Sequence, residues 1–348
     1  MNVTPLPGIP FSALALSVVV TSPAVTQQVE EAPSTVNATY VAESATDALE
    51  PGEKIENLFN KNITQDYILQ RLTDRIWFFQ ALFAGTMFYV GDEGVLLIDA
   101  AEGHANAINA AIGEVTDLPI SALLYSHNHA DHIGDASVLA EQIPGLRIIA
   151  TEATARLLER LGSSHPEPTE VIDADTNTFR FEDLTVRVVP LELSGHARDH
   201  AIYVPEGTGV IHVPDIFNPD QPPFWAFGGA ESYLGYREMI ETVGSLEWDH
   251  LSASHGNVGS RDDVEFYLTY LDDLEAAVAE AIVNVPRGTG IENPEAINNH
   301  AAYISTWIPE LGKYARDVLR PTYGDYYGFE YSTPKNAEMV AWWMFVYR

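Results

Sequence analysis

The stretch Ser126-His127-Asn128-His129-Ala130-Asp131-His132-Ile133-Gly134-Asp135 places three imidazoles and two carboxylates within ten residues. It follows an apolar run at 120–125, which reads Ile-Ser-Ala-Leu-Leu-Tyr. Imidazoles seldom cluster on a loop unless an electron-poor partner, most often zinc, gathers them. His127 and His129 are two residues apart, so in an extended chain their side chains project to the same side and can bind one ion. The pattern predicts a metal-binding loop at the end of a strand, and the alternative is a polar turn with surface histidines.

The pattern His-x-His-x-Asp-His at 127–132 resembles the signature of the metallo-β-lactamase-fold superfamily. Three later segments are similar to further motifs of that family. Residues 193–198 (Leu-Ser-Gly-His-Ala-Arg) resemble its second histidine motif, and 209–215 resemble an apolar strand that ends in a bridging aspartate. Residues 251–256 resemble its closing strand with a terminal histidine. The resemblance extends over roughly residues 76–281 and does not include the C-terminal tail.

The sequence departs from the family pattern at one position and matches it at one further strand. Pro214 stands where many family members have glycine, immediately before the candidate bridging residue Asp215. The upstream run 94–99 matches an early strand of the family that ends in an aspartate. The resemblance implies that this aspartate, Asp99, supports the metal loop without binding metal. His200, four residues after His196, is a weaker candidate for the same kind of support, and a surface or packed histidine is the alternative.

The resemblance implies two adjacent metal sites that share a carboxylate. In the family pattern the first metal is held by His127, His129 and His196, the second by Asp131, His132 and His255, and Asp215 bridges the two. Two cations about 3.5–4 Å apart lower the pKa of a bridging water toward neutrality, which implies a hydroxide that attacks a carbonyl. Asp131 is then the expected catalytic residue, because it can orient the hydroxide and pass its proton to the leaving group. Two Zn²⁺ ions are the expected cofactors, with iron or manganese as alternatives.

The coarse pattern of the chain predicts two β-sheets packed face to face with helices outside, because strands separated by helices recur in two halves. The resemblance implies an α/β fold, the four-layer αβ/βα sandwich of the metallo-β-lactamase type, over residues 66–285. A C-terminal helical extension rich in aromatic residues is expected at 286–348. Thr151 and Ser260 are expected to begin helices. The helix after Ser260 should end at Pro286, and Asn293-Pro294 should begin another.

The loop at 217–229 is rich in proline and aromatic residues and begins close to Asp215. Such a loop suits the wall of an apolar substrate pocket, and the alternative is that its aromatic side chains anchor it to the core. The helix that follows offers two tyrosines to hydrogen-bond a substrate carbonyl. The candidate pocket residues from the loop and this helix are Phe224, Trp225, Phe227, Tyr233 and Tyr236.

The implied ligand set predicts a binuclear metal-dependent hydrolase whose small-molecule substrate is a carboxylic ester or lactone. A β-lactamase and a thioester hydrolase of the glyoxalase II kind share this ligand set and remain alternatives. Their substrates carry carboxylates, and family members that bind them place cations near the site, whereas only Arg198 and Arg237 are at hand here. An iron-dependent oxidoreductase or dioxygenase of the same fold is an alternative from another class. Its diiron form is disfavoured, because such members usually have glutamate where this chain has His129.

The charge balance is strongly acidic. The chain has 18 Lys plus Arg against 50 Asp plus Glu, a formal charge of −32. This charge predicts no nucleic-acid partner and no anionic membrane partner, because both would be repelled. The composition resembles that of salt-adapted, halophilic proteins, and the alternative is an ordinary acidic protein. We expect a higher melting temperature in molar salt than in dilute buffer, because screening suppresses self-repulsion. A melting temperature indifferent to salt would contradict this expectation.

The N-terminal segment 1–24 contains an apolar run of signal-peptide length at 11–20, followed by Ser22-Pro23-Ala24 at a suitable cleavage position. The run is too short to span a membrane, and no lysine or arginine precedes it. A secreted or periplasmic protein is expected, and a disordered leader on a cytoplasmic protein is the alternative. Residues 25–60 are expected to form a disordered or extended lead-in, because they are rich in Ser, Thr, Ala, Pro and Glu. The sequence leaves the oligomeric state open, with a dimer among the alternatives.

Overall fold

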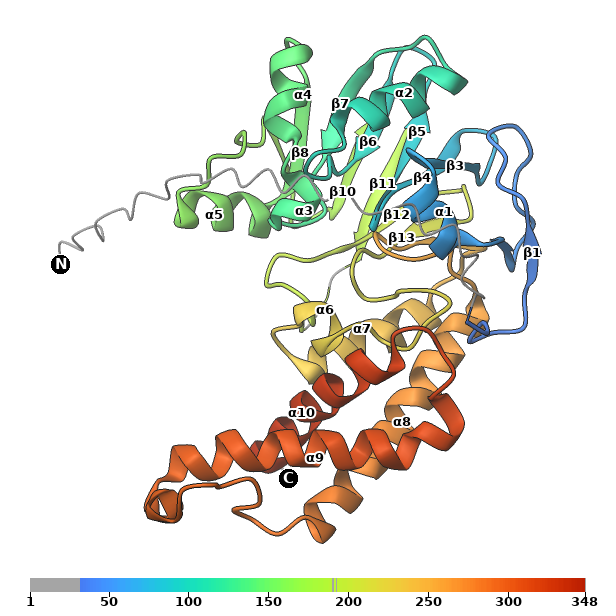
Figure 1. Cartoon of the computed structure of the whole chain (residues 1–348). Helices are drawn as coiled ribbons and strands as arrows, with labels where there is room; N and C mark the ends of the chain where they lie inside the picture. The colour runs from blue at the N-terminus through green and yellow to red at the C-terminus, as the bar shows by residue number, and fades with distance from the viewer. Residues whose placement is uncertain (1–31, 190, 192, 348) are drawn as a thin grey trace, which may run out of the picture. The chain divides into compact units, whose positions relative to one another are not determined.

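The computed structural model describes residues 32–189, 191 and 193–347. The predictions of a signal peptide at 1–24 and of a lead-in over 25–31 therefore lie outside the described residues. The described residues belong to one structural unit, in which two large sheets are followed by a group of helices (Figure 1).

The first sheet has seven strands that lie side by side in the order of the chain. They are β3 (Ile68–Arg71), β4 (Ile76–Ala81), β5 (Ala84–Val90), β6 (Val95–Ile98), β7 (Ile120–Leu124), β8 (Arg147–Thr151) and β9 (Glu170–Ile172). Strands β3 to β6 pair antiparallel, whereas β6 to β9 pair parallel. Parallel neighbours need crossover connections, and these contain α2 (Ala105–Val115), α4 (Ala136–Gln142) and α5 (Glu152–Leu161). Thr151 caps α5 as predicted, because its hydroxyl accepts the Thr154 N–H at 3.1 Å.

The second sheet has five strands, again in the order of the chain. They are β10 (Thr178–Phe181), β11 (Leu184–Val189), β12 (Ile202–Pro205), β13 (Val210–His212) and β14 (His250–Ser252). Its last pair, β13 and β14, is parallel, and the connection between them contains α6 (Ala226–Gly229) and α7 (Tyr233–Ser245). Each sheet thus ends in a parallel portion, which places the carboxyl ends of neighbouring strands at the same edge.

Three apolar cores hold the layers together. One lies between the sheets and joins Phe78 and Leu124 of the first sheet to Val186 and Tyr203 of the second. Another lies between the first sheet and its helices, where Leu97 packs with residues of α2 and α4. A third covers the other face of the second sheet with α7 and the C-terminal helices. This arrangement confirms the predicted α/β fold of two sheets packed face to face with helices outside (Figure 1).

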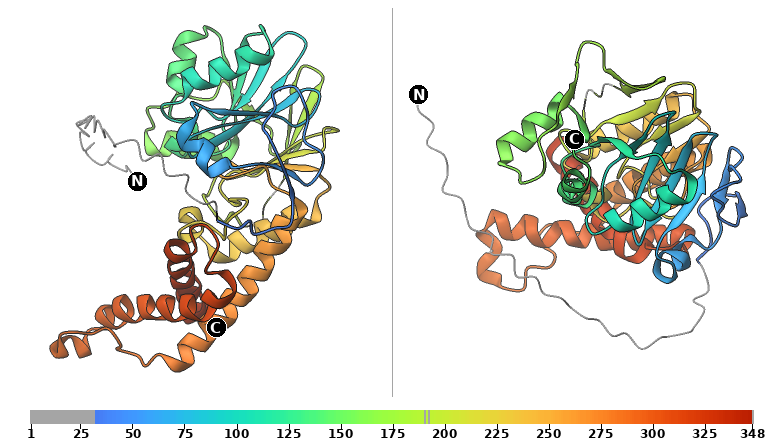
Figure 2. Two further views of the ribbon diagram at one scale, coloured as in Figure 1. Left: turned by 45° about the vertical axis from the view of Figure 1, so that its right-hand side comes forward. Right: turned by 90° about the horizontal axis from the view of Figure 1, so that it is seen from above.

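The C-terminal helices are α8 (Arg261–Asn284), α9 (His300–Tyr323) and α10 (Phe329–Tyr347). Helices α8 and α10 lie next to α7, and α9 packs against both of them. Their buried side chains belong to the same core as Ile211 of β13 (Figures 1 and 2). Ser260 caps α8, and this helix ends just before Pro286, as predicted. At the predicted helix start Asn293-Pro294 a helix does begin, but it is the short 3₁₀ helix η1 (Pro294–Asn298) and not an α-helix. Helix α9 starts later because the Asn299 side chain accepts the Ala302 N–H at 3.1 Å. Among the described residues, no helix is both long and apolar enough to cross a bilayer.

Over 32–60 the predicted disordered or extended lead-in is ordered, and parts of it are extended. It contains the parallel pair β1 (Thr39–Val41) and β2 (Glu53–Ile55), and it leads into α1 (Leu58–Thr64). Lys54 is fully buried, and its Nζ lies 2.9 Å from a carboxylate oxygen of both Asp220 and Asp263. Its partners lie far along the chain, so local composition did not reveal that the segment packs against the domain.

Candidate metal centre

Seven predicted ligands reach one edge of the sandwich from four connections. His127, His129, Asp131 and His132 follow β7, and the last two lie on the short helix α3 (Ala130–Ile133). Asp215 follows β13 and His255 follows β14, while His196 lies on the connection between β11 and β12. Since β13 and β14 are parallel neighbours, their carboxyl ends deliver both ligands to the same place.

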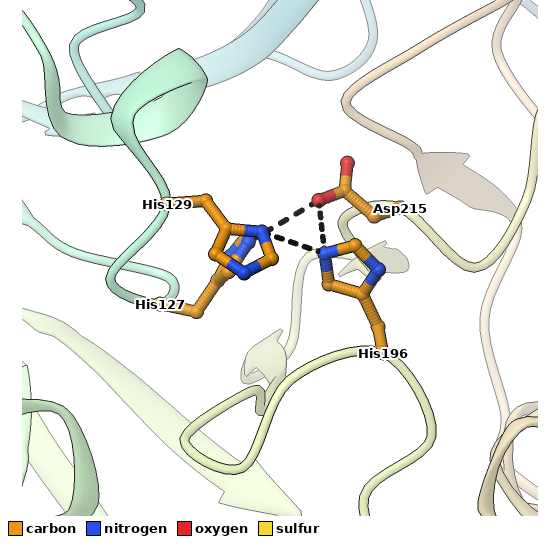
Figure 3. Close-up of side chains that lie close together, drawn as sticks. All are labelled: His127, His129, His196 and Asp215. Atoms are coloured by element: carbon orange, nitrogen blue, oxygen red, sulfur yellow. Dashed lines mark hydrogen bonds and ion pairs between the residues drawn. The ribbon is translucent and has the colours of Figure 1, made fainter. Parts of the chain in front are cut away.

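The first group of ligand atoms belongs to His127, His129, His196 and Asp215, and all of these atoms lie within 4.8 Å of one another (Figure 3). The Asp215 Oδ2 atom is 3.2 Å from His127 Nε2 and 3.0 Å from His196 Nε2. His196 Nε2 is also 2.9 Å from His129 Nδ1. These are the three histidines that the resemblance assigned to the first metal, together with the bridging aspartate.

The second group consists of Asp131, His132 and His255, whose ligand atoms also lie within 4.8 Å of one another. Asp215 reaches this group too: its Oδ2 lies 2.9 Å from His132 Nε2, and its Oδ1 lies 3.1 Å from His255 Nε2. The structure therefore brings all seven predicted ligands together. Asp215 contacts histidines of both groups, which is the geometry that a bridging carboxylate requires.

The donor atoms of this cluster fit metal ions. His127 Nε2 and His132 Nε2 are buried and make no aligned hydrogen bond, although both lie close to Asp215. A buried polar atom without a partner costs about 1–3 kcal/mol, so the cluster is incomplete as a set of side chains alone. Cations would complete it. Imidazole nitrogens and carboxylate oxygens without any thiolate suit zinc, iron or manganese.

The electrostatics of the cluster favour a neutral His127 and an ionised Asp215, the forms that bind a cation, whereas His132 is held in its charged form by its carboxylate neighbours. Burial, reinforced by the neighbouring His132, holds the pKa of His127 well below its ordinary value, which leaves a neutral imidazole. Burial opposes ionisation of Asp215, but His132 and the other ring nitrogens outweigh it and hold the pKa of this carboxyl well below its usual range. Burial likewise opposes the charged form of His132, yet Asp215 and Asp99 raise its pKa well above the ordinary value. A buried anion surrounded by imidazoles is a cation site.

Asp99 supports the metal loop without joining either ligand group. It follows β6, and its Oδ1 accepts the Ser126 N–H at 2.8 Å. Its Oδ2 accepts the Ser126 hydroxyl at 2.6 Å and lies 3.0 Å from His132 Nδ1. These contacts orient the His132 ring so that its Nε2 faces Asp215. His200 is buried close to the same centre, and its Nε2 lies 2.5 Å from the Pro214 carbonyl oxygen, beside Asp215.

The backbone is specialised at two ligand positions. Gly195, before His196, lies so close to α7 that an added Cβ would be 2.4 Å from the backbone of Tyr236. Only glycine lets this loop approach the helix so closely. Asp215 has φ +63°, in the left-handed region that aspartate tolerates better than most residues. The sharp turn aims its carboxylate back at the histidines.

A cavity of about 460 Å³ opens over the metal centre. Its floor includes His129, His196, Asp215 and His255, and Asp131 also lines it. Apart from two glycines, its other walls combine aromatic side chains with neutral amides: Phe59, Phe83, Phe224, Tyr327, Asn62, Gln80, Asn218 and Gln221. Among the residues that the structure describes, no lysine or arginine lines this cavity.

Of the predicted substrate-pocket residues, Phe224 lines the cavity and the other four do not. Trp225 faces a different hollow, beside Trp342 of α10. Phe227 is fully buried against two tyrosines, because the chain turns back at Phe227 and Gly228 with positive φ angles. The predictions for these two residues are therefore wrong.

The two tyrosines are occupied elsewhere. Tyr236 donates a hydrogen bond to the Ile216 carbonyl at 2.6 Å, and Tyr233 donates to Glu275 at 2.7 Å. They anchor the loop and α7 to the core, and the prediction that they line the pocket is wrong. The other seven wall residues were not predicted. Three of them, Phe59, Asn62 and Tyr327, come from outside the motif-bearing region and carry no local signal.

A family model described as the metallo-beta-lactamase superfamily matches residues 82–255, half of the chain. This chain belongs to the metallo-beta-lactamase superfamily. The match spans the motifs that supply all seven candidate ligands of the superfamily centre, from the His127 loop to His255. It does not include α1 or the C-terminal helices.

Curated relatives of this superfamily chain are similar over short stretches. A hydroxyacylglutathione hydrolase from Xanthomonas campestris pv. campestris (strain B100) is 36% identical over 89 residues, which are 26% of this chain and 30% of the relative. An exodeoxyribonuclease, YycJ, from Bacillus anthracis is 34% identical over 104 residues, which are 29% of this chain and 39% of the relative. The chain thus spans less than half the length of these curated relatives.

Solved structures of the superfamily share the fold. A metallo-beta-lactamase from Pontibacter korlensis superposes with a TM-score of 0.50 at 17% identity, covering 59% of this chain and 98% of that one. The metallo-beta-lactamase IND-7 superposes with a TM-score of 0.51 at 18% identity, covering 60% of this chain and 99% of that one. At these identities the likeness concerns the fold alone.

Proposed function

We propose that this protein is a binuclear metal-dependent hydrolase that opens an uncharged carboxylic ester or lactone. The observation that carries the proposal is the convergence of seven ligands around Asp215 on the floor of a cavity without cationic side chains among its described residues. Membership of the metallo-beta-lactamase superfamily supports a metal-dependent hydrolase. A match to hydroxyacylglutathione hydrolases supports attack on a carbonyl.

Each ligand group would bind one of the two metal ions. His127, His129 and His196 would hold one cation and Asp131, His132 and His255 the other, with Asp215 between them. Bound cations supply a nucleophile derived from water at neutral pH, and they polarise the carbonyl that it attacks. The Asp131 side chain is 60% exposed and lines the cavity, so its carboxylate can take up a proton and release it to a departing alkoxide.

The preference for an uncharged substrate follows from the positions of the nearest arginine side chains. Arg198 extends from the loop of His196, but it pairs with Glu231 at 2.9 Å and its side chain is 72% exposed. Arg237 is held by Asp272 at 2.7 Å and by Glu275 at 3.1 Å. Neither lines the cavity, so a β-lactam or a glutathione thioester would bring its carboxylates to cavity walls without a cationic side chain. The formal charge of −32 likewise opposes a nucleic-acid substrate.

Elemental analysis combined with a substrate panel tests the proposal. We expect about two metal ions per chain, and removal of the metals by a chelator should abolish turnover of lactones and aryl esters. β-Lactams, thioesters and phosphodiesters should be turned over much more slowly. Iron together with oxygen consumption would favour the oxidoreductase alternative instead.

A substitution identifies the ligands in the same assay. His196→Ala should lower both the metal content and the hydrolytic rate, because His196 contributes a nitrogen to the first group. His165→Ala, at a histidine outside both groups, is the matched control and should change neither. Unchanged metal content and rate in His196→Ala would overturn the ligand assignment.

A further inference from the structure

Two segments outside the matched superfamily region complete the cavity over the metal centre. Helix α1 contributes Phe59 and Asn62, which lie three residues apart and so on the same side of the helix. The connection between α9 and α10 contributes Tyr327. The Phe59 and Tyr327 rings stack with centroids 4.3 Å apart and an interplanar angle of 14°. One wall of the cavity is therefore an aromatic pair built from both ends of the chain.

The aromatic side chains at the cavity are unusually accessible. Tyr327 is 43% exposed, Phe83 is 61% exposed and Phe224 is 48% exposed. Large apolar side chains that gather around one concave opening and stay exposed mark a binding surface for apolar groups. These side chains thus offer apolar area that a ligand can cover.

The same cavity contains buried amide groups without partners. Asn62 is 3% exposed and Gln80 is 1% exposed, and neither Asn62 Oδ1 nor Gln80 Oε1 has a hydrogen-bond partner. Both residues line the cavity. An unpaired buried acceptor is costly, and a ligand N–H or O–H that reached it would relieve that cost. The pair indicates that the ligand carries a hydrogen-bond donor besides its apolar group.

We propose that Phe59, Tyr327, Asn62 and Gln80 form a substrate subsite that selects uncharged esters or lactones bearing both an apolar chain and an amide N–H or a hydroxyl. The subsite rests on the proposed hydrolytic function of the metal centre and gives it a substrate class. Phe59 and Tyr327 cover the apolar chain, and the two amide oxygens accept the donor. Helix α1 and the connection between α9 and α10 lie outside residues 82–255, which the family model matches. The selectivity would therefore come from segments that are not part of the matched region.

Phenyl esters of alkanoic acids test the apolar half of the subsite. In the holoenzyme, each added methylene should raise kcat/KM about fourfold over the first few carbons, the factor expected for burying one methylene. Phe59→Ala and Tyr327→Ala should flatten this dependence. Tyr331→Ala, at a residue that is 82% exposed and outside the cavity, is the matched control and should keep it.

Phenyl esters of N-acylglycines, compared with alkanoate esters of equal length, test the polar half. The wild-type enzyme should prefer the amide-bearing ester about tenfold, and Asn62→Leu, similar in size, should lose that preference while keeping the chain-length dependence. Calorimetric binding of the matching anilides gives a readout that does not need turnover. Melting curves show whether each variant is folded.

The outcomes separate the two proposals. If esters are hydrolysed but the variants keep the wild-type chain-length and amide preferences, the subsite is wrong and the hydrolytic function stands. If no ester or lactone is hydrolysed by the metal-loaded enzyme, while anilides bind in a manner that depends on Phe59 and Tyr327, the hydrolytic function is wrong and the subsite stands.

Discussion

Replacement of Asp215 by asparagine should release metal from both sites and lower the hydrolytic rate by about a thousandfold or more. Effects of this size are usual when a catalytic site loses a residue on which its other residues depend. Asp215 lies within 3.2 Å of ring nitrogens from both ligand groups. Asparagine keeps the shape of the side chain but removes its negative charge. The buried His132 then loses the carboxylate that most strongly raises its pKa.

Elemental analysis and initial rates on the same preparation measure this effect. Asp74→Asn is the control for the change in formal charge, because the Asp74 side chain is fully exposed and distant in sequence from the ligands. It should keep two metals per chain and the full rate. An Asp215→Asn enzyme that retains both metals and normal turnover would show that this carboxylate does not bridge the sites.

Replacement of Lys54 by methionine should lower the free energy of unfolding by about 3–5 kcal/mol, the usual cost of removing one partner from a buried ion pair. Lys54 is fully buried and holds Asp220 and Asp263, so methionine leaves two carboxylates without their cation. Burial opposes the charge on Lys54, but the two aspartates outweigh it and raise its pKa. Because the pKa is higher in the folded state, this stabilisation is fully present below about pH 10 and is lost only as the pH rises through the folded pKa.

The same variant should weaken metal binding. Asp220 lies five residues after Asp215, and Asn257 lies two residues after His255. The Asn257 side-chain N–H donates a hydrogen bond of 2.8 Å to Asp220 Oδ2. The Asn257 side chain is in turn tied to the backbone of Ile55, next to Lys54. Loss of the Lys54 ammonium group should therefore loosen the loop that carries Asp215 and the loop that carries His255.

Denaturant unfolding and chelator competition measure the two effects of Lys54→Met. Lys313→Met is the matched control, because its ion pair with Glu310 lies on an exposed helix surface. Such pairs contribute about 0–1 kcal/mol, so the control should unfold near the wild-type midpoint with unchanged metal affinity. Equal midpoints for the two variants would contradict a structural role for the buried cluster.

Much of the fold was predictable because its determinants are local. The predicted caps Thr151 and Ser260 begin α5 and α8, and α8 ends just before Pro286 as expected. Capping and apolar periodicity act over a few residues, so short windows of sequence contain them. The helix start expected at Asn293-Pro294 became a short 3₁₀ helix, and the long α-helix α9 begins after a second cap, Asn299, six residues later.

The candidate metal ligands could also be predicted from the sequence. Several donor side chains stand at short spacings in His127–His132, and single donors follow later strands. The walls of the cavity were decided only by tertiary structure. Lys54 meets Asp263 across 209 positions, and Phe59 stacks on Tyr327 across the length of the domain. Such contacts form only when distant elements pack around a shared core, so no local pattern encodes them. Short motifs therefore predict the candidate metal site, whereas the shape of the cavity above it depends on side chains that are distant in sequence and meet only in the folded protein.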